Sequence, residues 1–306
     1  MNVEKWINNN TTTLQGKVVA ITGTTGGLGS VLARQVLSLN ASLLMLDRNL
    51  TKSLALRDKL LQEFPNADIQ NVTLDMGVIK NVEEVCNQLE GMQIDYLILN
   101  AGVYNVPLVQ GNVGYNNVFQ VNFISPYRFV KRLMPTLKQN CAKVIAVGSI
   151  AHKFTKLDVN DVDYSNYKKA SKIYGNSKRF LMFSLFELFK NEQDVSLAVV
   201  HPGVTLTNMT NHYPKGINWL VKIGIKLLFP RPKQATLCIL DGLFEDCEYK
   251  QWIGPSRCDI WGKPKRKKLT TCSADESKQI FAIAESVYAK VNDQIALHTL
   301  AMPKQQ

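Results

Sequence analysis

The sequence predicts an α/β fold in which a Rossmann-like, doubly wound parallel sheet is covered by helices on both faces. Three observations predict it. Short apolar segments typical of buried strands alternate with longer helical segments along most of the chain. A glycine-rich turn follows the first strand, and polar residues or glycine follow the later ones. Because the carboxyl ends of parallel strands meet at one edge of a sheet, we expect these residues to line a ligand site.

The first strand, turn and helix form a unit that suits a phosphate group. A strand over residues 18–21 leads into the turn Thr-Gly-Thr-Thr-Gly-Gly-Leu-Gly, and a helix is expected over residues 30–39. Gly23 permits the tight turn, Gly27 lets a pyrophosphate approach the backbone, and Gly29 lets the helix pack against the strand. The N–H groups and partial positive charge of the helix N-terminus attract phosphates. The unit therefore predicts a dinucleotide site.

The later elements continue the alternation. Strands are expected over residues 42–46, 69–74, 96–99, 143–147 and 195–200, and helices over residues 51–64, 82–89, 115–137 and 167–190. The residues that directly follow these strands include Asp47, Asp75, Asn100 and His201. Near the C-terminus, a capping box at residues 273–276 starts a helix whose apolar residues recur at helical spacing as far as Val291.

Length and composition limit the class of protein. The chain has 306 residues, of which 45% are hydrophobic, and this suffices for a globular core. No apolar run reaches the roughly 18 residues that a membrane-spanning helix needs, and the first residues lack the apolar core of a signal peptide. Six scattered cysteines without a Cys-x-x-Cys pair indicate reduced thiols. We therefore expect a cytoplasmic protein, and the four widely spaced histidines predict no metal site.

The chain is basic, with a net charge of +11. Such a charge can indicate nucleic-acid binding, but most of the lysines and arginines are dispersed. One run stands out, and it consists of Lys263, Lys265, Arg266, Lys267 and Lys268. We expect this run to be a solvated basic loop, and we expect no nucleic acid among the partners.

The chemistry is predicted by Tyr174 and Lys178, which stand one helical turn apart on the same face of an expected helix. A tyrosine with a pKa of about 10 is a poor base at neutral pH, and a positive charge within about 4–6 Å lowers that pKa by roughly 1 to 3. Tyr174 is then able to exchange a proton with an alcohol or carbonyl oxygen. A second Tyr-x-x-x-Lys sequence begins at Tyr164, but it follows the acidic, polar residues 158–163 and is expected in a loop.

With these motifs combined, the chain resembles a short-chain dehydrogenase/reductase over about residues 15–210. The matching residues, in chain order, are Thr22, Gly23, Gly27 and Gly29 of the glycine motif, Asn100, Ala101 and Gly102 of an Asn-Ala-Gly element, the single residues Asn122 and Ser149, Tyr174 and Lys178, and Pro202, Gly203 and Thr207 of a Pro-Gly-x-x-x-Thr element. The long spacing between Ser149 and Tyr174 is similar to that in the retinol dehydrogenase-like and WW-domain oxidoreductase-like branch.

The resemblance implies an oxidoreductase that transfers a hydride between a nicotinamide cofactor and an alcohol or carbonyl substrate. It implies that Tyr174 is the general acid/base, that Lys178 binds the nicotinamide ribose and lowers the pKa of Tyr174, and that Ser149 orients the substrate oxygen. Asn122 is implied to help hold a water that relays protons. Cofactor contacts are implied for Thr22, Gly23, Thr25, Gly27, Leu28, Gly29, Asp47, Arg48, Asp75, Asn100, Ala101, Gly102, Tyr174, Lys178, Pro202, Gly203 and Thr207.

The choice between NAD and NADP depends on Asp47 and Arg48. A carboxylate at Asp47 can accept hydrogen bonds from the adenosine ribose and would repel a 2′-phosphate, which favours NAD. Arg48 follows directly, at a position where relatives that use NADP often carry arginine. The similar branch usually has a neutral residue before that arginine, so the two residues leave the cofactor open, with NAD slightly favoured.

The resemblance also implies how the chain is organised. The implied parts are one domain over residues 1–306, with a cofactor-binding and catalytic core (15–210), a substrate lid (204–240) and a C-terminal extension (241–306). Residues 216–229 of the lid are mostly apolar, which indicates an apolar or bulky small-molecule substrate. Two alternatives remain: Lys222 and Lys226 face lipid headgroups in a peripheral membrane contact, or the stretch packs against the protein's own core.

Two further expectations concern function class and self-association. A non-catalytic NAD(P)-binding sensor or scaffold protein is the alternative to an enzyme, although a sensor would need neither Tyr174 nor Lys178. Apolar side chains between residues 180 and 189 surround their helix almost completely, whereas a helix on a sheet face needs one apolar stripe. A homo-oligomer that covers this surplus is therefore predicted, unless residues 252–291 fold back over the helix within one chain.

Overall fold

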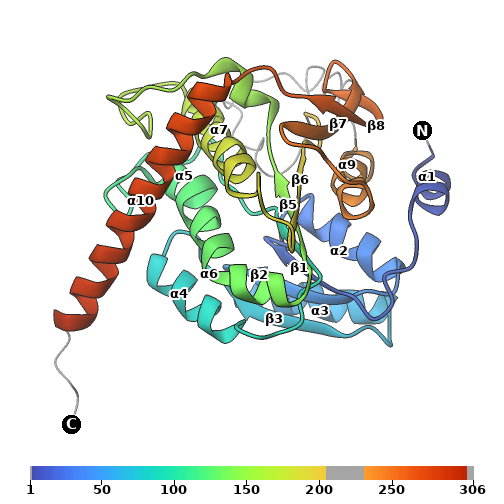
Figure 1. Ribbon diagram of the computed structural model, residues 1–306. Coiled ribbons are helices and arrows are strands. Elements are labelled where there is room, and N and C mark those ends of the chain that lie inside the picture. Colours follow the sequence, from blue (N-terminus) through green and yellow to red (C-terminus); the bar gives the residue numbers. More distant parts are fainter. Residues whose placement is uncertain (1, 205–230, 302–306) are drawn as a thin grey trace, which may run out of the picture.

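A computed structural model describes residues 2–204 and 231–301, which build one sheet flanked by helices (Figure 1). The sheet has eight strands in the order β3-β2-β1-β4-β5-β6-β7-β8. All paired neighbours are parallel except β7 and β8, which are antiparallel. The strands are β1 (Val18–Thr22), β2 (Ser42–Asp47), β3 (Ile69–Thr73), β4 (Tyr96–Leu99), β5 (Lys143–Val147), β6 (Ser196–Val200), β7 (Gln251–Arg257) and β8 (Trp261–Lys268). The predicted doubly wound, Rossmann-like fold is confirmed.

Helices cover both faces of this sheet. They are α1 (Val3–Asn10), α2 (Gly29–Ser38), α3 (Leu50–Glu63), α4 (Ile79–Gln88), α5 (Asn117–Phe119), the π-helical turn η1 (Gln120–Ile124), α6 (Ser125–Gln139), the 3-10 turn η2 (Ile150–Phe154), α7 (Ala170–Leu188), α9 (Pro232–Phe244) and α10 (Ala274–Ala301). Helices α2, α3 and α9 lie on one face, and α4, α6 and α7 lie on the other. The unpredicted helix α1 adds its buried Trp6 to the first of these faces.

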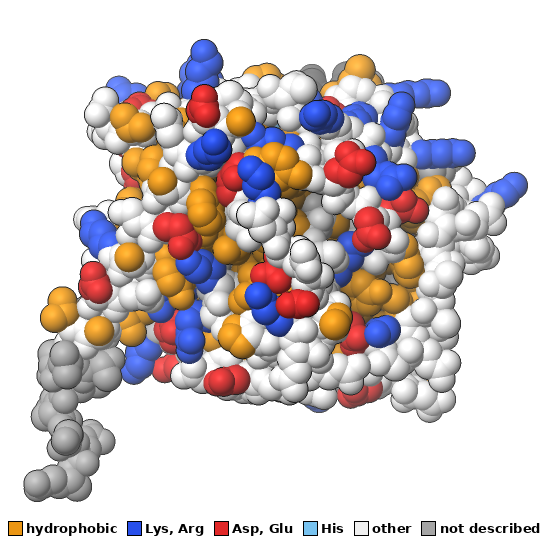
Figure 2. All heavy atoms as spheres, in the orientation of Figure 1, with side chains coloured by type: hydrophobic (Ala, Val, Ile, Leu, Met, Phe, Trp, Pro, Cys, Tyr) orange, Lys and Arg blue, Asp and Glu red, His pale blue; other side chains and the backbone are white. Residues whose placement is uncertain are grey.

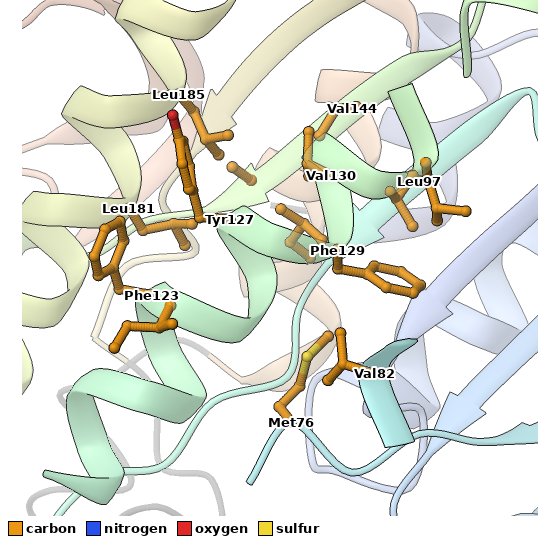
Figure 3. Close-up of a cluster of buried hydrophobic side chains, with 14 of the residues drawn as sticks. Met76, Val82, Leu97, Phe123, Tyr127, Phe129, Val130, Val144, Leu181 and Leu185 are labelled. Carbon is orange, nitrogen blue, oxygen red and sulfur yellow. The ribbon is translucent and has the colours of Figure 1, made fainter. Parts of the chain in front are cut away.

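Neighbouring residues of each central strand serve opposite faces, because side chains alternate along a strand. On β4, Leu97 belongs to the core beneath α4, α6 and α7, whereas Ile98 belongs to the core beneath α2 and α9. Figure 3 shows the first of these cores, where Phe129 and Val130 of α6 lie close to Leu97 over the sheet. Both faces are therefore dry, as the continuous apolar strands predict.

The helix predicted over residues 115–137 is divided. Helix α5 leads into the π-helical turn η1, and α6 begins only at Ser125. Pro126 lies at the start of α6 directly after η1, and because it lacks an N–H group it cannot donate a hydrogen bond back into η1. The interruption matters for the site, since η1 carries Asn122.

The basic run forms a strand and not the predicted loop. Residues 261–268 are β8, which pairs with β7 at the edge of the sheet, and six of its eight side chains are exposed. Figure 2 shows basic side chains gathered over β7 and β8. An edge strand tolerates exposed lysines, because among the described residues it pairs on one side alone. The loop prediction is therefore wrong, although the residues are solvated as expected.

Helix α7 is covered within the chain. Phe180 and Leu185 are completely buried, and α10 lies along α7 with its Ile280 and Ala284 equally buried (Figure 1). The C-terminal segment thus folds back over the helix, which was the alternative to a covering second subunit. The apolar surplus of α7 therefore no longer gives a reason to predict a homo-oligomer.

Polar contacts fix α10 on the helices beneath it. Lys131 Nζ lies 2.6 Å from Glu285 Oε2, and Arg128 Nη1 donates to Asn292 Oδ1 at 2.6 Å. The buried Arg128 also pairs with Glu83 of α4 at 2.5 Å. These contacts join α4, α6 and α10, which are far apart in the sequence.

The segment expected as a substrate lid falls into two parts. Residues 205–230, with Lys222 and Lys226, lie outside the described residues. Residues 232–240 belong to α9, whose Leu237 and Leu240 are completely buried against the sheet, so this part is core and not lid. No helix among the described residues is long and apolar enough to cross a membrane, and all six cysteines are free thiols.

We expect Phe180→Ala to lower the free energy of unfolding by about 3–5 kcal/mol, as removal of a buried phenyl group generally does. Phe180 is completely buried, and its ring lies 5.0 and 5.2 Å from the rings of Phe119 and Phe123. Urea unfolding measures the change. Phe154→Ala is the matched control, because that side chain is 63% exposed and its loss should cost less than about 0.5 kcal/mol. Equal losses in both variants would contradict the assignment of Phe180 to the core.

Candidate active site

The glycine turn joins β1 to α2 at the carboxyl edge of the sheet. Gly23 has a positive φ of +74°, and a Cβ on Gly29 would stand 2.1 Å from the Gly23 carbonyl oxygen. Glycine is therefore required at both positions. Gly27 and Leu28 lie between them, and no side chain among the described residues caps the first turn of α2. The Ser30 N–H donates to Gly26 O at 3.0 Å, which leaves the N–H groups before it for an anion, so the turn fits the pyrophosphate of a dinucleotide.

The Asp47 carboxylate lies beneath this turn and is 1% exposed. Its Oδ1 accepts from Thr25 N at 3.0 Å and Thr25 Oγ1 at 3.3 Å, and its Oδ2 accepts from Ser53 Oγ at 2.7 Å and from Thr24 Oγ1. Four donors fill the acceptor positions of a carboxylate. The structure thus differs from the expectation that Asp47 faces the ribose, whereas Arg48 beside it is exposed.

Sequence reasoning missed Thr24 and Ser53 as members of this arrangement. Thr24 occupies a variable position of the glycine motif and Ser53 belongs to no motif, so their role appears only when the turn, β2 and α3 are brought together. Asn71 extends the same network from β3, because its Nδ2 donates to Ser53 Oγ at 2.7 Å. The network fixes the turn from below.

The Asn-Ala-Gly element holds the glycine turn from the side. Asn100 Nδ2 donates to Thr22 O at 2.9 Å and to Gly23 O at 3.0 Å. The Thr22 hydroxyl accepts from the N–H groups of Asn100 and Ala101 at 3.0 and 2.9 Å. A Cβ on Gly23 would approach Ala101 Cα to 3.1 Å. Asn100 and Ala101 therefore hold the glycine turn in its shape.

Asn122 connects the same element to α7. Its Oδ1 accepts from Val103 N at 2.8 Å, and its Nδ2 donates to Val103 O at 2.9 Å and to Ser177 Oγ at 3.1 Å. A Cβ on Gly102 would lie 3.1 Å from Asn122 Oδ1 and 3.7 Å from Lys178 Nζ. Gly102 thus leaves room between these two polar side chains. A π-helical turn, common at functional sites, is what presents Asn122 here.

Ser149, Tyr174 and Lys178 meet where β5 ends against α7. Ser149 follows β5 and begins η2, and its Oγ accepts from Ala151 N at 3.2 Å. A hydrogen bond joins the side chains of Ser149 and Tyr174. Lys178 Nζ donates to Val147 O at 2.8 Å and lies 5.9 Å from the centroid of the Tyr174 ring. The structure therefore brings together the four residues that the resemblance implied, Asn122 included.

Burial governs the protonation of this group. It raises the pKa of Tyr174 to about 12, against the opposing effect of the hydrogen bond with Ser149, and it lowers the pKa of Lys178 to about 8. The sequence predicted that Lys178 lowers the pKa of Tyr174. The structure shows no such lowering. The Lys178 ammonium group donates to Val147 O, and the burial of Tyr174 has the largest effect on the pKa of its phenol. At neutral pH the phenol of Tyr174 is protonated.

Tyr104 was not predicted as a site residue. Its ring stands edge-on to the ring of Tyr174, with the centroids 5.2 Å apart and the planes at 80°. It also contributes to the raised pKa of Tyr174. Its position two residues after the Asn-Ala-Gly element, in the segment that follows β4, could have indicated that Tyr104 lies at the site.

The second Tyr-x-x-x-Lys sequence is structural, as expected. Tyr164 lies in a loop with a positive φ of +60°, and its ring stacks on Tyr167 at 4.0 Å. Its hydroxyl donates to Lys156 O and accepts from Lys156 N. These contacts anchor the loop that contains residues 158–163.

The remaining predicted residues lie at other strand ends. Asp75 Oδ1 accepts from Gly77 N at 2.8 Å just after β3. Pro202 and Gly203 follow β6, and a Cβ on Gly203, whose φ is +83°, would lie 2.7 Å from Ile260 O in the turn between β7 and β8. Thr207 lies outside the described residues.

Comparison with known proteins identifies the family that combines this sheet with this set of residues. The family model described as short chain dehydrogenase matches residues 17–218. The chain belongs to the short-chain dehydrogenase family. Curated relatives of this short-chain dehydrogenase include mouse retinol dehydrogenase 14, which is 28% identical over 65% of this chain and 64% of its own length. The chain thus spans less than two thirds of that relative's length.

Other relatives agree with the predicted branch. The chloroplastic short-chain dehydrogenase TIC 32 A of Brassica napus is 29% identical over 71% of this chain and 73% of its own length. Human WW domain-containing oxidoreductase is 27% identical over 61% and 49%. Among solved structures, an uncharacterised protein from Mycobacterium paratuberculosis superposes with a TM-score of 0.74 at 19% identity, over 92% of this chain and 96% of that one. The predicted short-chain dehydrogenase/reductase family is confirmed, and members of the predicted branch are among the relatives that match.

Two buried histidines make the fold sensitive to acid. His152 and His201 are 0% and 2% exposed, and burial lowers the pKa of each from 6.5 to about 4. The unfolded chain therefore takes up protons on both below pH 6.5, whereas the folded chain does so only near pH 4. Each histidine lowers the free energy of unfolding by roughly 1.4 kcal/mol per pH unit across this window as the pH falls.

Asp241 opposes this effect, because burial raises its pKa from 3.8 to about 6, so the folded chain binds one more proton there between those values. We therefore expect a net loss of roughly 1.4 kcal/mol per pH unit between about pH 5.5 and 4.5, measured by urea unfolding. Asp241→Asn removes the opposing proton and should about double that slope. A free energy of unfolding that stays constant from pH 6.5 to 4.5 would contradict the buried, neutral state of the histidines.

Proposed function

We propose that this short-chain dehydrogenase is an NAD(P)-dependent oxidoreductase that exchanges a hydride with an alcohol or carbonyl substrate. One observation carries the proposal: Asn122, Ser149 and the pair Tyr174 and Lys178 come from three separate parts of the chain and converge beside the glycine turn. A nicotinamide cofactor, when bound at that turn, supplies or accepts the hydride. A hydride transfer also needs a group that moves a proton at the substrate oxygen, and this set provides one.

In the proposed mechanism, Tyr174 exchanges the proton. Its phenol is protonated at neutral pH and is thus ready to donate to a carbonyl oxygen during reduction. Ser149, already hydrogen-bonded to Tyr174, orients the same substrate oxygen. In the oxidation direction the phenolate has to form, and the hydrogen bond with Ser149 favours it. The absence of a side chain at Gly102 keeps Asn122 and Lys178 facing each other without a group between them.

We propose NADP(H) as the preferred cofactor, in place of the slight preference for NAD that the sequence indicated. The Asp47 carboxylate is buried and already accepts four hydrogen bonds, so binding a ribose hydroxyl would require it to give one up. Arg48 is exposed and makes no ion pair with the described residues, which suits a 2′-phosphate. NADP occurs in the solved complexes of Pseudomonas aeruginosa RhlG and of a metagenomic short-chain oxidoreductase, both similar in fold with TM-scores of 0.58 and 0.54.

We further propose an apolar or bulky substrate. Tyr104 presents an aromatic wall beside the Tyr174 phenol, where the substrate oxygen has to bind. The apolar sequence of residues 216–229 supports the same class. Turnover of a panel of apolar ketones and alcohols with NADPH, NADH and their oxidised forms tests the proposal. Tight cofactor binding without turnover of any member would favour a sensor protein instead.

We expect Tyr174→Phe to lower turnover by at least about 100-fold, because the phenyl ring cannot exchange a proton. The dissociation constant of the cofactor should change little, since the glycine turn holds the phosphates. Steady-state kinetics and fluorescence titration measure the two quantities. Tyr164→Phe is the control, because among the described residues its hydroxyl bonds Lys156 and Tyr167, which lie outside the catalytic set, and turnover should persist. Loss of turnover in the control but not in Tyr174→Phe would reverse the assignment.

Arg48→Ala should weaken NADPH binding by about 10- to 100-fold, which corresponds to the loss of a charge-assisted hydrogen bond to phosphate. NADH, which lacks the 2′-phosphate, should bind almost as before. Lys52→Ala removes the same charge from the exposed surface of α3 and serves as the control. Fluorescence titration of both cofactors provides the measurement. An equal loss for NADH and NADPH would show that Arg48 does not read the phosphate.

A further inference from the structure

The turn η2 carries Ser149 and is held by residues that the proposed mechanism does not use. Ser149 begins η2, and three residues later His152 is completely buried. Its Nδ1 lies 2.6 Å from Ser149 O, and its Nε2 lies 2.9 Å from Thr271 Oγ1. The imidazole thus stands between the backbone of Ser149 and the segment that leads into α10.

These contacts select one form of the imidazole. A carbonyl oxygen can only accept a hydrogen bond, so Nδ1 carries the hydrogen that is donated to Ser149 O. In a neutral imidazole Nε2 then has to accept, and the Thr271 hydroxyl is its donor. Burial keeps the ring neutral above about pH 4, which agrees with this form. Two hydrogen bonds therefore define both the tautomer and the direction of the ring.

Aromatic rings restrict the remaining freedom of His152. The Trp252 ring meets the imidazole edge to face, with the centroids 5.4 Å apart and the planes at 88°, and Phe183 of α7 does so at 5.9 Å and 68°. The side chain is completely buried, so it cannot touch a substrate. Any influence on catalysis has to pass through the groups that His152 contacts, and Ser149 is the one of these that belongs to the proposed catalytic set.

Arg179 holds His152 and Thr271 together. It directly follows Lys178, its side chain is 1% exposed, and it donates to His152 O at 3.3 Å and to Thr271 O at 2.7 Å. Its charge is paired with Glu276 Oε1 of α10 at 2.7 Å. The helix that carries Lys178 and the turn that carries Ser149 are thus joined through residues of the C-terminal segment.

We infer that His152 is a positioning residue: as the Nδ1–H tautomer required by the Ser149 carbonyl and held by Thr271, it fixes the Ser149 backbone and hence the direction of the Ser149 hydroxyl towards Tyr174. The inference rests on the proposed function, because it assigns Ser149 a role in orienting substrate. It also gives the C-terminal segment a part in catalysis, although among the described residues no hydrogen bond joins that segment to the Ser149 hydroxyl or to Tyr174. Misplacement of a reacting group by about 1 Å can lower a rate on the order of 100-fold.

Two pairs of variants of the full chain test the inference. His152→Leu removes the donor to Ser149 O and should lower kcat on the order of 100-fold. His152→Asn places an amide N–H near the position of Nδ1 and should restore kcat to within about tenfold of the native value. Thr271→Val removes the donor to Nε2 with almost no change of shape, whereas Thr271→Ser retains it. The valine variant should lose about tenfold in kcat, corresponding to one hydrogen bond, and the serine variant should stay within about threefold.

Three readouts separate positioning from a general loss of structure. The cofactor dissociation constant should remain within about twofold in all four variants, because none of them alters a residue of the glycine turn. Nitrogen-15 NMR of the imidazoles in the native chain should show one neutral Nδ1–H histidine. The chemical shift of its Nε2 should change in Thr271→Val. This spectrum does not depend on turnover, so it tests the relay even if the proposed reaction fails.

Several results would overturn the inference. One is an Nε2–H tautomer at His152, and another is native kcat in His152→Leu. Parallel losses of kcat and of cofactor binding would assign a merely structural role to His152. If His152→Leu fails to fold, the Thr271 pair decides, since equal kcat in its valine and serine variants contradicts the relay.

Discussion

The burial of helix α7 is the constraint on which the rest of the structure depends. Tyr174 and Lys178 reach the sheet edge from this helix, and their direction is fixed only if the helix cannot rotate or slide. Phe180 packs against η1, α10 closes the outer side, and Arg179 locks the helix to η2. A helix covered on all sides needs apolar residues on all sides, and this explains a sequence that has far more than one stripe.

The site is held mainly by hydrogen bonds to the backbone. Asn100 bonds the carbonyls of the glycine turn, Asn122 bonds both groups of Val103, and Lys178 bonds Val147 O. Side chains that bind backbone groups at strand ends satisfy polar groups that the sheet cannot pair. The same residues thus complete the fold and shape the site, so their substitution is expected to affect both.

Much of this could be predicted from the sequence, because the signals are local. The glycine turn, the apolar strands and the pair Tyr174 and Lys178 each depend on spacing within a short segment, whereas Asn122 and Ser149 came from the family resemblance. Contacts between distant segments could not be predicted in the same way. The buried carboxylate of Asp47, the relay from Thr271 to Ser149 and the pairing of the basic run with β7 arise only when tertiary structure brings separate segments together. The raised pKa of Tyr174 could not be predicted from the sequence either, since it depends on burial and not on the lysine four residues away.

The basic strand β8 has a consequence for the behaviour of the protein in solution. It closes one end of the sheet, and among the described residues its outer row of N–H and C=O groups has no neighbouring strand. Such a row can template aggregation by pairing with the edge of another molecule, but Lys263, Lys265 and Lys268 are exposed along it and Pro264 interrupts its donors. Two such edges repel each other, and salt screens that repulsion within about 10 Å at 0.1 M ionic strength. Colloidal stability of this chain is therefore tied to ionic strength through one short strand.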